Sequence, residues 1–260
     1  MSSGDRPAAQ VPVVWCRYVH QMETPMARTA TARTKGGAPA KVPAHSHTSL
    51  RQFEQCPQRF YRQRVTREVK DLPGKASEYG DIVHKAMELR VREGRPLPDN
   101  LKQLEQLAQF IAEVPGIVTC EQSLGCRADM TPCGFFDADV WLRGKLDVLV
   151  DQGEEALLLD YKTGKWRGDD GQAGRNAVLI FANMPRVNRI SSRFLYIAEN
   201  KIEKKEFTRD ELRMIVAPTL RIDNDIKWAT EHDNWPMRPS GLCAYCPVTF
   251  CPNWREPKRG

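Results

Sequence analysis

The stretch GKLDVLVDQGEEALLLDYKTGKW, residues 144–166, limits the possible folds of this chain more than any other segment. Its centre, Gly153-Glu154, is typical of a two-residue hairpin loop with glycine first, so the flanking residues are predicted to pair as antiparallel strands. Counting outward from that loop places Asp147 opposite Asp160. The leucine run 157–159 predicts a strand buried on both faces, in the middle of a sheet.

The charged residues of this hairpin indicate a metal site. Lys162 is expected on the same face as Asp160, because side chains alternate along a strand. Two neighbouring carboxylates, Asp147 and Asp160, repel each other unless a positive charge lies between them. Mg²⁺ binds oxygen ligands and lowers the pKa of a bound water, which Lys162 could orient. The alternative is an Asp–Lys ion pair on an exposed face, but charges at the end of a buried strand favour the site.

Helices are predicted around these strands, which gives an α/β fold. Ser49 with Gln52 has the spacing of a capping box, and Pro57 is expected to break the helix that starts there. In the next helix Ile82, Val83, Ala86 and Met87 are expected on one side. The predicted helices are 76–93, 101–114, 173–184 and one that starts at Thr208 with Glu211 and is kinked at Pro218. The predicted strands are 118–126, 137–151 and 155–164, followed by a hairpin over 193–207.

Composition places this fold in a soluble, intracellular protein. The chain has 260 residues, 41% of them hydrophobic, which suits one or two domains. No apolar run approaches the length of a membrane span, and the start does not resemble a signal peptide. Residues 1–47 hold six of the Lys and Arg residues against two acids, +4 of the total +6. We expect a disordered basic tail over 1–47 and one domain over 48–260.

The eight cysteines favour metal ligation over disulfides, because intracellular chains seldom form disulfides. Cys243 and Cys246 form a C-x-x-C unit, and Cys251 follows closely. A closed site needs a fourth ligand, for which Cys56 in EQCPQRFY is the candidate. The remaining thiols in and around the hairpin region, Cys120, Cys126 and Cys133, are expected to bind no metal.

Three motifs together resemble the PD-(D/E)XK nuclease superfamily, specifically its RecB-like branch. They are GDIVH, GKLD and LLLDYKTGKW, in that order along the chain. The resemblance covers roughly residues 48–254 and implies a restriction-endonuclease-like mixed sheet flanked by helices. It implies a Mg²⁺ or Mn²⁺ site and these catalytic residues: His84, Asp147 and Asp160 as metal ligands with Tyr161, and Lys162 beside the attacking water. Gly80 lies on the same helical face as His84 and lets the backbone approach the sheet.

The same resemblance suggests accessory residues. A glutamate at the position of Glu121 assists the site in some relatives. Relatives also carry Q-x-x-x-Y-A in the helix after the lysine, where this chain has Gln172 and Asn176 followed by a departure from that pattern, NAVLIFA. Asn176 is expected to substitute for the missing polar residue.

The cysteines resemble an iron–sulfur subgroup of this branch, which includes CRISPR-adaptation nucleases and AddB-type recombination proteins. In that subgroup one cysteine before the nuclease core and three after it hold a [4Fe–4S] cluster. The resemblance assigns Cys56, Cys243, Cys246 and Cys251 to a cluster that joins the two ends of the domain. Zn²⁺ in the same four thiolates and unliganded thiols are the alternatives.

The first ordered helix is rich in arginine and aromatic residues. Arg51, Arg59 and Arg62 are candidates for phosphate contacts, and Tyr61 is a candidate for stacking on unpaired bases. A solvated basic helix with its aromatic side chains in the core explains the same pattern, and both interpretations stay open.

The predicted function is that of a Mg²⁺- or Mn²⁺-dependent DNA exonuclease acting on single-stranded DNA or DNA ends. The expected setting is the cytoplasm of a bacterial cell, with the gene bacterial or carried by a phage. Relatives of this kind serve recombination, repair, phage DNA metabolism or CRISPR adaptation, so proteins of those systems are the expected partners. The alternative is a non-catalytic iron–sulfur DNA-binding or scaffold module of a recombination complex.

Overall fold

The computed structural model describes residues 42–71, 75–166, 168 and 171–256. Residues 1–41 of the expected basic tail lie outside this range. The fold begins before the expected boundary at residue 48. The buried His45 donates its backbone N–H to the carbonyl of Trp141 at 2.7 Å, and its own carbonyl accepts from Arg143.

Within the described residues, six strands form one mixed sheet in the order β2-β1-β3-β4-β5-β6. The strands are β1 (Ile117–Cys126), β2 (Pro132–Cys133), β3 (Leu142–Asp151), β4 (Glu155–Lys162), β5 (Arg189–Tyr196) and β6 (Lys201–Thr208). Strands β4 and β5 are parallel, and the other neighbours are antiparallel. The predicted α/β class and the central place of β4 are confirmed, because all but the end residues of β4 are buried.

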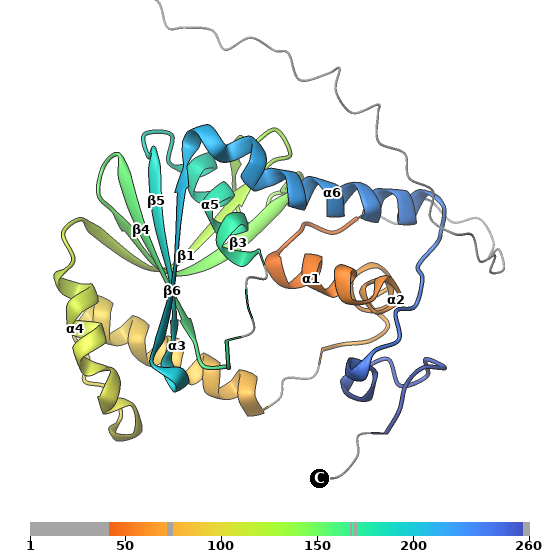
Figure 1. Ribbon diagram of the computed structural model, residues 1–260, viewed down its shortest axis with the longest axis horizontal. Helices are drawn as coiled ribbons and strands as arrows, with labels where there is room; N and C mark the ends of the chain where they lie inside the picture. The colour runs from red at the N-terminus through yellow and green to blue at the C-terminus, as the bar shows by residue number, and fades with distance from the viewer. Residues whose placement is uncertain (1–41, 72–74, 167, 169–170, 257–260) are drawn as a thin grey trace, which may run out of the picture. The chain divides into compact units, whose positions relative to one another are not determined.

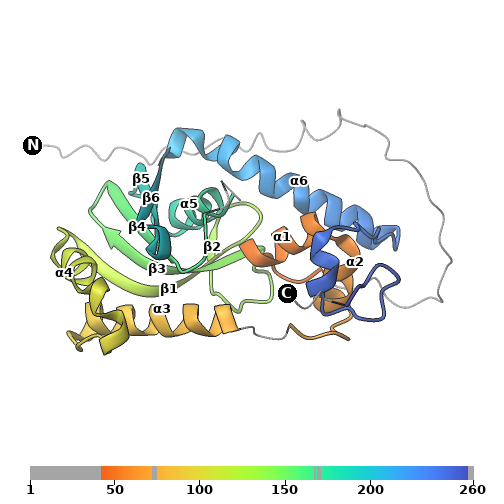
Figure 2. The ribbon, with the colours of Figure 1, turned by 60° about the horizontal axis from the view of Figure 1, so that its bottom comes forward.

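Helices cover both faces of this sheet. Helices α3 (Lys75–Glu93) and α4 (Glu105–Glu113) lie on one face, and α5 (Gln172–Asn183) and α6 (Leu212–Glu231) lie on the other (Figures 1 and 2). Helices α1 (His47–Gln55) and α2 (Pro57–Phe60) lie beside the C-terminal segment in both views. The short elements are the π-turn η1 (Tyr61–Val65) and the 3₁₀ turns η2 (Asp99–Leu104), η3 (Ile197–Glu199), η4 (Arg209–Glu211) and η5 (Gly241–Tyr245).

Two apolar cores follow from this layering. One is formed by α3, α4 and the sheet, with Val83 and Met87 fully buried. The larger one joins the opposite sheet face to α1, α5 and α6. The buried apolar side chains of the central strands therefore pack against one helical layer or the other, which fixes the faces of these strands.

The helices differ from the sequence predictions at two boundaries and in the exposure of one residue. Helix α1 starts one turn early, because Ser46 and Ser49 form the capping box and Gln52 is buried inside the helix. The 101–114 segment divides into η2 and α4. On α3, Ile82 is 54% exposed, because it lies on the side of the helix away from the sheet.

The other predicted helix boundaries are confirmed within one residue, whereas the strand predicted from residue 137 starts at Leu142 and the hairpin predicted over 193–207 starts at Arg189. Cys56 ends α1 with extended backbone, and Pro57 starts α2 at its first position, where its missing N–H costs nothing. Thr208 and Glu211 form the predicted capping box, and α6 continues through Pro218.

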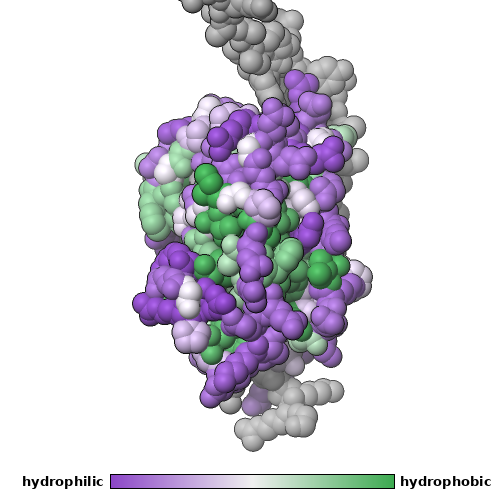
Figure 3. Space-filling model, turned by 90° about the vertical axis from the view of Figure 1, so that its left-hand side faces the viewer, coloured by the Kyte–Doolittle hydropathy of each residue, from purple (hydrophilic) through white to green (hydrophobic). Residues whose placement is uncertain are grey.

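The surface near α4 mixes apolar and polar side chains. Figure 3 shows this side of the molecule, with apolar residues between polar ones. A cavity of about 620 Å³ is lined by residues of α4 and of the starts of β4 and β5, among them Phe110 and Arg193. Within the part of the chain that the structure describes, no helix is both long enough and apolar enough to cross a membrane.

Candidate nuclease site

The predicted hairpin places Asp147 and Asp160 at the point where β3 and β4 separate. Gln152 donates its N–H to the carbonyl of Glu155 at 3.0 Å, which confirms the two-residue loop. The ladder runs outward from there and ends with Val148 opposite Leu159, so Asp147 and Asp160 follow directly after the last pair. Beyond this pair, a side chain replaces a main-chain acceptor, because Asp147 Oδ2 accepts the Tyr161 N–H at 2.8 Å.

At Asp147, the side chains of β1 and β3 also switch the face of the sheet toward which they point. Val148 packs in the α3 core, whereas Leu146, two residues away, packs in the α5 core. Regular alternation would put both in the same core. Between them, Asp147 lies opposite Glu121, where the pairing of β1 with β3 is interrupted and Glu121 adopts a left-handed backbone with φ of 57°. This reversal brings the carboxylates of Asp147 and Glu121 to the α3 side of the sheet.

Helix α3 supplies His84 to these two carboxylates. His84 Nδ1 lies 3.2 Å from Asp147 Oδ1 and 3.9 Å from Glu121 Oε1. Its Nε2 lies 3.1 Å from the carbonyl oxygen of Tyr161, which can only accept, so Nε2 is the donor and Nδ1 faces the acids. The Asp147 hydrogen bond raises the pKa of His84, and the charges of Asp147, Asp160 and Glu121 add to this effect, against the lowering by burial.

Gly80 allows the close approach of α3, as predicted from the sequence. It lies one helical turn before His84, and a Cβ at this position would come 3.4 Å from the Thr163 hydroxyl. A larger side chain would push α3 away from the end of β4 and so move His84 away from the acids.

Asp160 and Lys162 lie on the α5 side of β4 and are linked by Gln172. Lys162 Nζ lies 2.6 Å from Asp160 Oδ1 and donates to Gln172 Oε1 at 2.7 Å. Gln172 Nε2 donates in turn to Asp160 Oδ2 at 2.9 Å. Burial and then the charge of Asp147 raise the pKa of Asp160 to about 7, against the lowering by Lys162. The first residue of α5 therefore fixes the geometry of both catalytic candidates.

These residues fit a divalent cation. Ligand atoms of His84, Glu121 and Asp147 all lie within 4.8 Å of one another. A cation at this place would offset the mutual repulsion of Asp147 and Asp160, which the raised pKa of Asp160 reflects. Carboxylates with one imidazole are a donor set that Mn²⁺ and Mg²⁺ accept.

Of the accessory candidates, Glu121 and Gln172 join the site and Asn176 does not contact its acids. Asn176 is buried in α5, and its Nδ2 has no hydrogen-bond acceptor among the described residues. Lys145, which no motif predicted as a site residue, forms an ion pair with Glu121. Its place in GKLD, two residues before Asp147, was the available signal.

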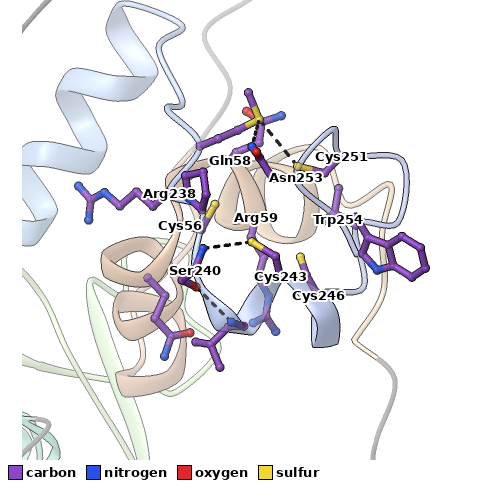
Figure 4. A pocket seen from close by; sticks show the side chains of 15 residues that line it. Cys56, Gln58, Arg59, Arg238, Ser240, Cys243, Cys246, Cys251, Asn253 and Trp254 are labelled. Carbon is purple, nitrogen blue, oxygen red and sulfur yellow. Dashed lines mark hydrogen bonds between the residues drawn. The ribbon is translucent and has the colours of Figure 1, made fainter. Parts of the chain in front are cut away.

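The four predicted cluster cysteines line one pocket. Cys56 at the junction of α1 and α2 meets Cys243, Cys246 and Cys251 of the C-terminal segment (Figure 4). Burial raises the pKa of Cys246, and the neighbouring Cys56 and Cys251 raise it further. The backbone N–H of Ser240 donates to Cys243 Sγ at 3.3 Å. Of the other described cysteines, Cys120 and Cys126 lie on β1 and Cys133 lies on β2, while Cys16 falls outside the described residues.

The predicted DNA-contact residues of the first helices have other partners in the structure. Tyr61 stacks on Trp235, with ring centroids 4.9 Å apart, and so belongs to the aromatic core. Arg62 pairs with Glu68 at 2.6 Å. Arg59 donates to Gln63, and Arg51 is partly exposed on α1. Trp235, far away in sequence, covers one face of the Tyr61 ring, which stays partly exposed, so the stacking role of Tyr61 stays a prediction.

Comparison with known proteins gives one family match and a set of similar solved structures. A model of the PD-(D/E)XK nuclease superfamily matches residues 44–116 and 112–252. A candidate exonuclease from Eubacterium rectale is a similar solved structure, with a TM-score of 0.47, 15% identity, and coverage of 78% of this chain and 86% of that chain. The solved structure of SSO0001 gives a TM-score of 0.41 at 16% identity, and the match covers 85% of this chain and 89% of that chain. A search of curated proteins found no match. The family match spans most of the chain, which therefore belongs to the PD-(D/E)XK nuclease superfamily.

Proposed function

We propose that this protein is a Mg²⁺- or Mn²⁺-dependent DNA exonuclease of the RecB-like branch. The observation that carries the proposal is the convergence of His84, Glu121 and Asp147 beside the linked pair Asp160 and Lys162. When bound there, the metal would polarise a phosphate oxygen and lower the pKa of a water. The ligands would be His84 Nδ1 and the carboxylates of Glu121, Asp147 and Asp160, with the Tyr161 carbonyl orienting the imidazole.

The chain's own residues supply the remaining chemistry. Lys162 has three N–H donors, and Asp160 and Gln172 engage two of them. The third is available to orient a water or a phosphate oxygen. Because Gln172 is bonded to both partners, it keeps Lys162 directed toward the end of β4, where a phosphodiester would lie. Hydrolysis by this arrangement reads no base sequence, because phosphate contacts carry none.

We further propose that Cys56, Cys243, Cys246 and Cys251 hold a [4Fe–4S] cluster. Four thiols that converge from opposite ends of the domain are the supporting observation. Zn²⁺ in the same four thiolates is the alternative, and the iron and zinc content of the purified chain separates the two.

The nuclease proposal is tested with the full chain, purified anaerobically. End-labelled single-stranded and blunt duplex DNA are incubated with Mg²⁺, Mn²⁺ or EDTA, and products are resolved by length. We expect metal-dependent cleavage by the wild type and none by Asp160→Asn. Asp225→Asn, an exposed acid on α6, is the matched control. A metal-independent result, or full activity in Asp160→Asn, contradicts the site. If the wild type binds DNA without cutting it, the protein is a scaffold module.

A further inference from the structure

The sheet continues beyond the candidate site as a face open to solvent. On β3, Gly144 packs toward α5, since a Cβ there would come 2.8 Å from Leu179 Cδ1. Its neighbours Arg143 and Lys145 therefore point to the opposite face, the side of Asp147. Lys145 pairs across the strands with Ser123, and both are exposed. A basic, uncovered strip thus leads away from the metal ligands.

An exposed aromatic side chain ends this strip. Phe136 is 86% exposed, the highest value among the large apolar residues that the structure describes. The Arg143 guanidinium lies 4.9 Å from the Phe135 ring centroid and 5.7 Å from that of Phe136. Arg143 Nη1 also donates to the Phe135 carbonyl at 3.2 Å. Arg143, which lines the strip, therefore also holds Phe135 and Phe136 in place.

The loop that carries Phe136 is itself braced. Gly134 donates its N–H to Asp137 Oδ2 at 2.7 Å, and Asp137 returns its N–H to the Gly134 carbonyl at 3.1 Å. The other acid of the loop, Asp139, is paired with Arg127 at 2.5 Å. Asp137 is thus engaged within the loop, and Asp139 is engaged by Arg127 just after β1. Arg143 and Lys145 are the basic residues of the strip, and Lys145 is paired with Glu121 at the end nearest the metal ligands. A braced loop presents its ring with little loss of entropy when a partner stacks on it.

We propose that this strip binds single-stranded DNA next to the catalytic site, with Phe136 stacking on a base and Lys145 and Arg143 following the phosphates. The inference rests on the proposed nuclease function for its substrate. Arg143 and Asp147 are four residues apart on one strand, about 13 Å at about 3.3 Å per residue. Phe136 would therefore hold a nucleotide a short distance along the strand from the scissile phosphate, as an aromatic platform beside a basic groove does.

Binding is measured by fluorescence anisotropy with a labelled oligothymidylate and the cluster-loaded full chain in an Asp160→Asn background, so that nothing is cut. We expect Phe136→Ala to weaken binding about fivefold or more, which corresponds to the loss of one base stack. Phe136→Trp should bind within about twofold of the parent, because a larger π-face replaces the smaller one. Blunt duplex DNA should be affected less, because its bases are already stacked.

Met214→Ala is the matched control, since Met214 is 70% exposed and lies on α6. Equal affinities for Phe136→Ala and Met214→Ala would overturn the inference. A second readout separates it from the proposed function. Hydrolysis of bis(p-nitrophenyl) phosphate, which does not reach the strip, should be the same for wild type and Phe136→Ala. Loss of this activity in Phe136→Ala would assign Phe136 to the integrity of the active site and would also overturn the inference. If the wild type hydrolyses no phosphodiester, the proposed nuclease function is contradicted. The anisotropy measurement still tests whether the strip binds single-stranded DNA.

Discussion

At the scale of single residues, Glu121 shows how the fold accepts local strain at the site. A non-glycine residue in the left-handed region costs about 1 kcal/mol or more and persists where the surrounding structure requires it. Here the strained residue faces Asp147 and His84, and its carboxylate completes the ligand group. The strain therefore serves the placement of a charge on the α3 side of the sheet.

The strain at Glu121 is testable with two variants. Glu121→Gly removes the carboxylate and the strain, whereas Glu121→Gln removes the charge and keeps the strained backbone. We expect the glycine variant to be more stable than the glutamine variant by about 1 kcal/mol, because glycine adopts positive φ freely. Both should bind Mn²⁺ more weakly than the wild type. Urea unfolding and calorimetric titration measure the two effects, and equal stability of the variants would contradict the strain.

Lys162 carries a second prediction at the same scale. Lys162→Ala should retain Mn²⁺ binding, because the ammonium pairs with Asp160 and is not a metal ligand. Turnover should fall by about two to four orders of magnitude, the range for a lost proton-handling group. Lys165→Ala, an exposed lysine in the following loop, is the control and should keep its activity. Loss of metal affinity with normal turnover would contradict the assigned role.

At the scale of elements, the segment before α1 is fastened to α6 by a buried hydrogen bond between His45 and Asp223. His45 Nε2 lies 2.8 Å from Asp223 Oδ1, and Lys227 Nζ lies 2.8 Å from Asp223 Oδ2. Burial raises the pKa of Asp223, but the hydrogen bonds from His45 and Lys227 outweigh it and lower the pKa below its usual value. The pair joins residues 178 positions apart and orients α6 against the N-terminal helices.

This pair predicts a pH dependence of stability. Because the folded pKa of Asp223 is depressed, its contribution is present above the unfolded pKa of about 3.9 and is lost as the pH falls through the folded value. Asp223→Asn should therefore lower the urea midpoint at pH 7, and its midpoint should fall less steeply than that of the wild type below about pH 4. Midpoints measured from pH 7 to pH 2 check this. If the urea midpoints of the two proteins fall in parallel with pH, the interactions of Asp223 are not the source of the pH dependence.

At the scale of the whole domain, the cysteine pocket joins α1 and α2 to the last described residues. A ligand that binds only the folded state adds its binding free energy to stability, and a link between distant segments also restricts the unfolded chain. Cys56→Ser should therefore lose iron and lower the thermal midpoint of the entire domain. Cys133→Ser should change neither, because Cys133 lies on β2 outside the pocket. Iron per chain and differential scanning calorimetry measure both effects. Iron lost in Cys133→Ser but kept in Cys56→Ser would require a different ligand set.

The sequence alone determined the hairpin and the position of His84. Both depend on short-range rules, because turn chemistry fixes the register of β3 and β4 and helical spacing fixes Gly80 against His84. The same holds for the end of α1 at Cys56, where the following proline excludes a continuing helix.

Only the tertiary structure decided which residues complete the site. Glu121 reaches it because β1 and β3 reverse their facing together, and Gln172 reaches it because the start of α5 lies beside the end of β4. The Tyr61 ring packs one of its faces on Trp235, a contact that the local sequence could not predict. Each outcome depends on a partner far away in the chain. Local propensity and periodicity carry no information about such partners, since the packing of the whole domain selects them.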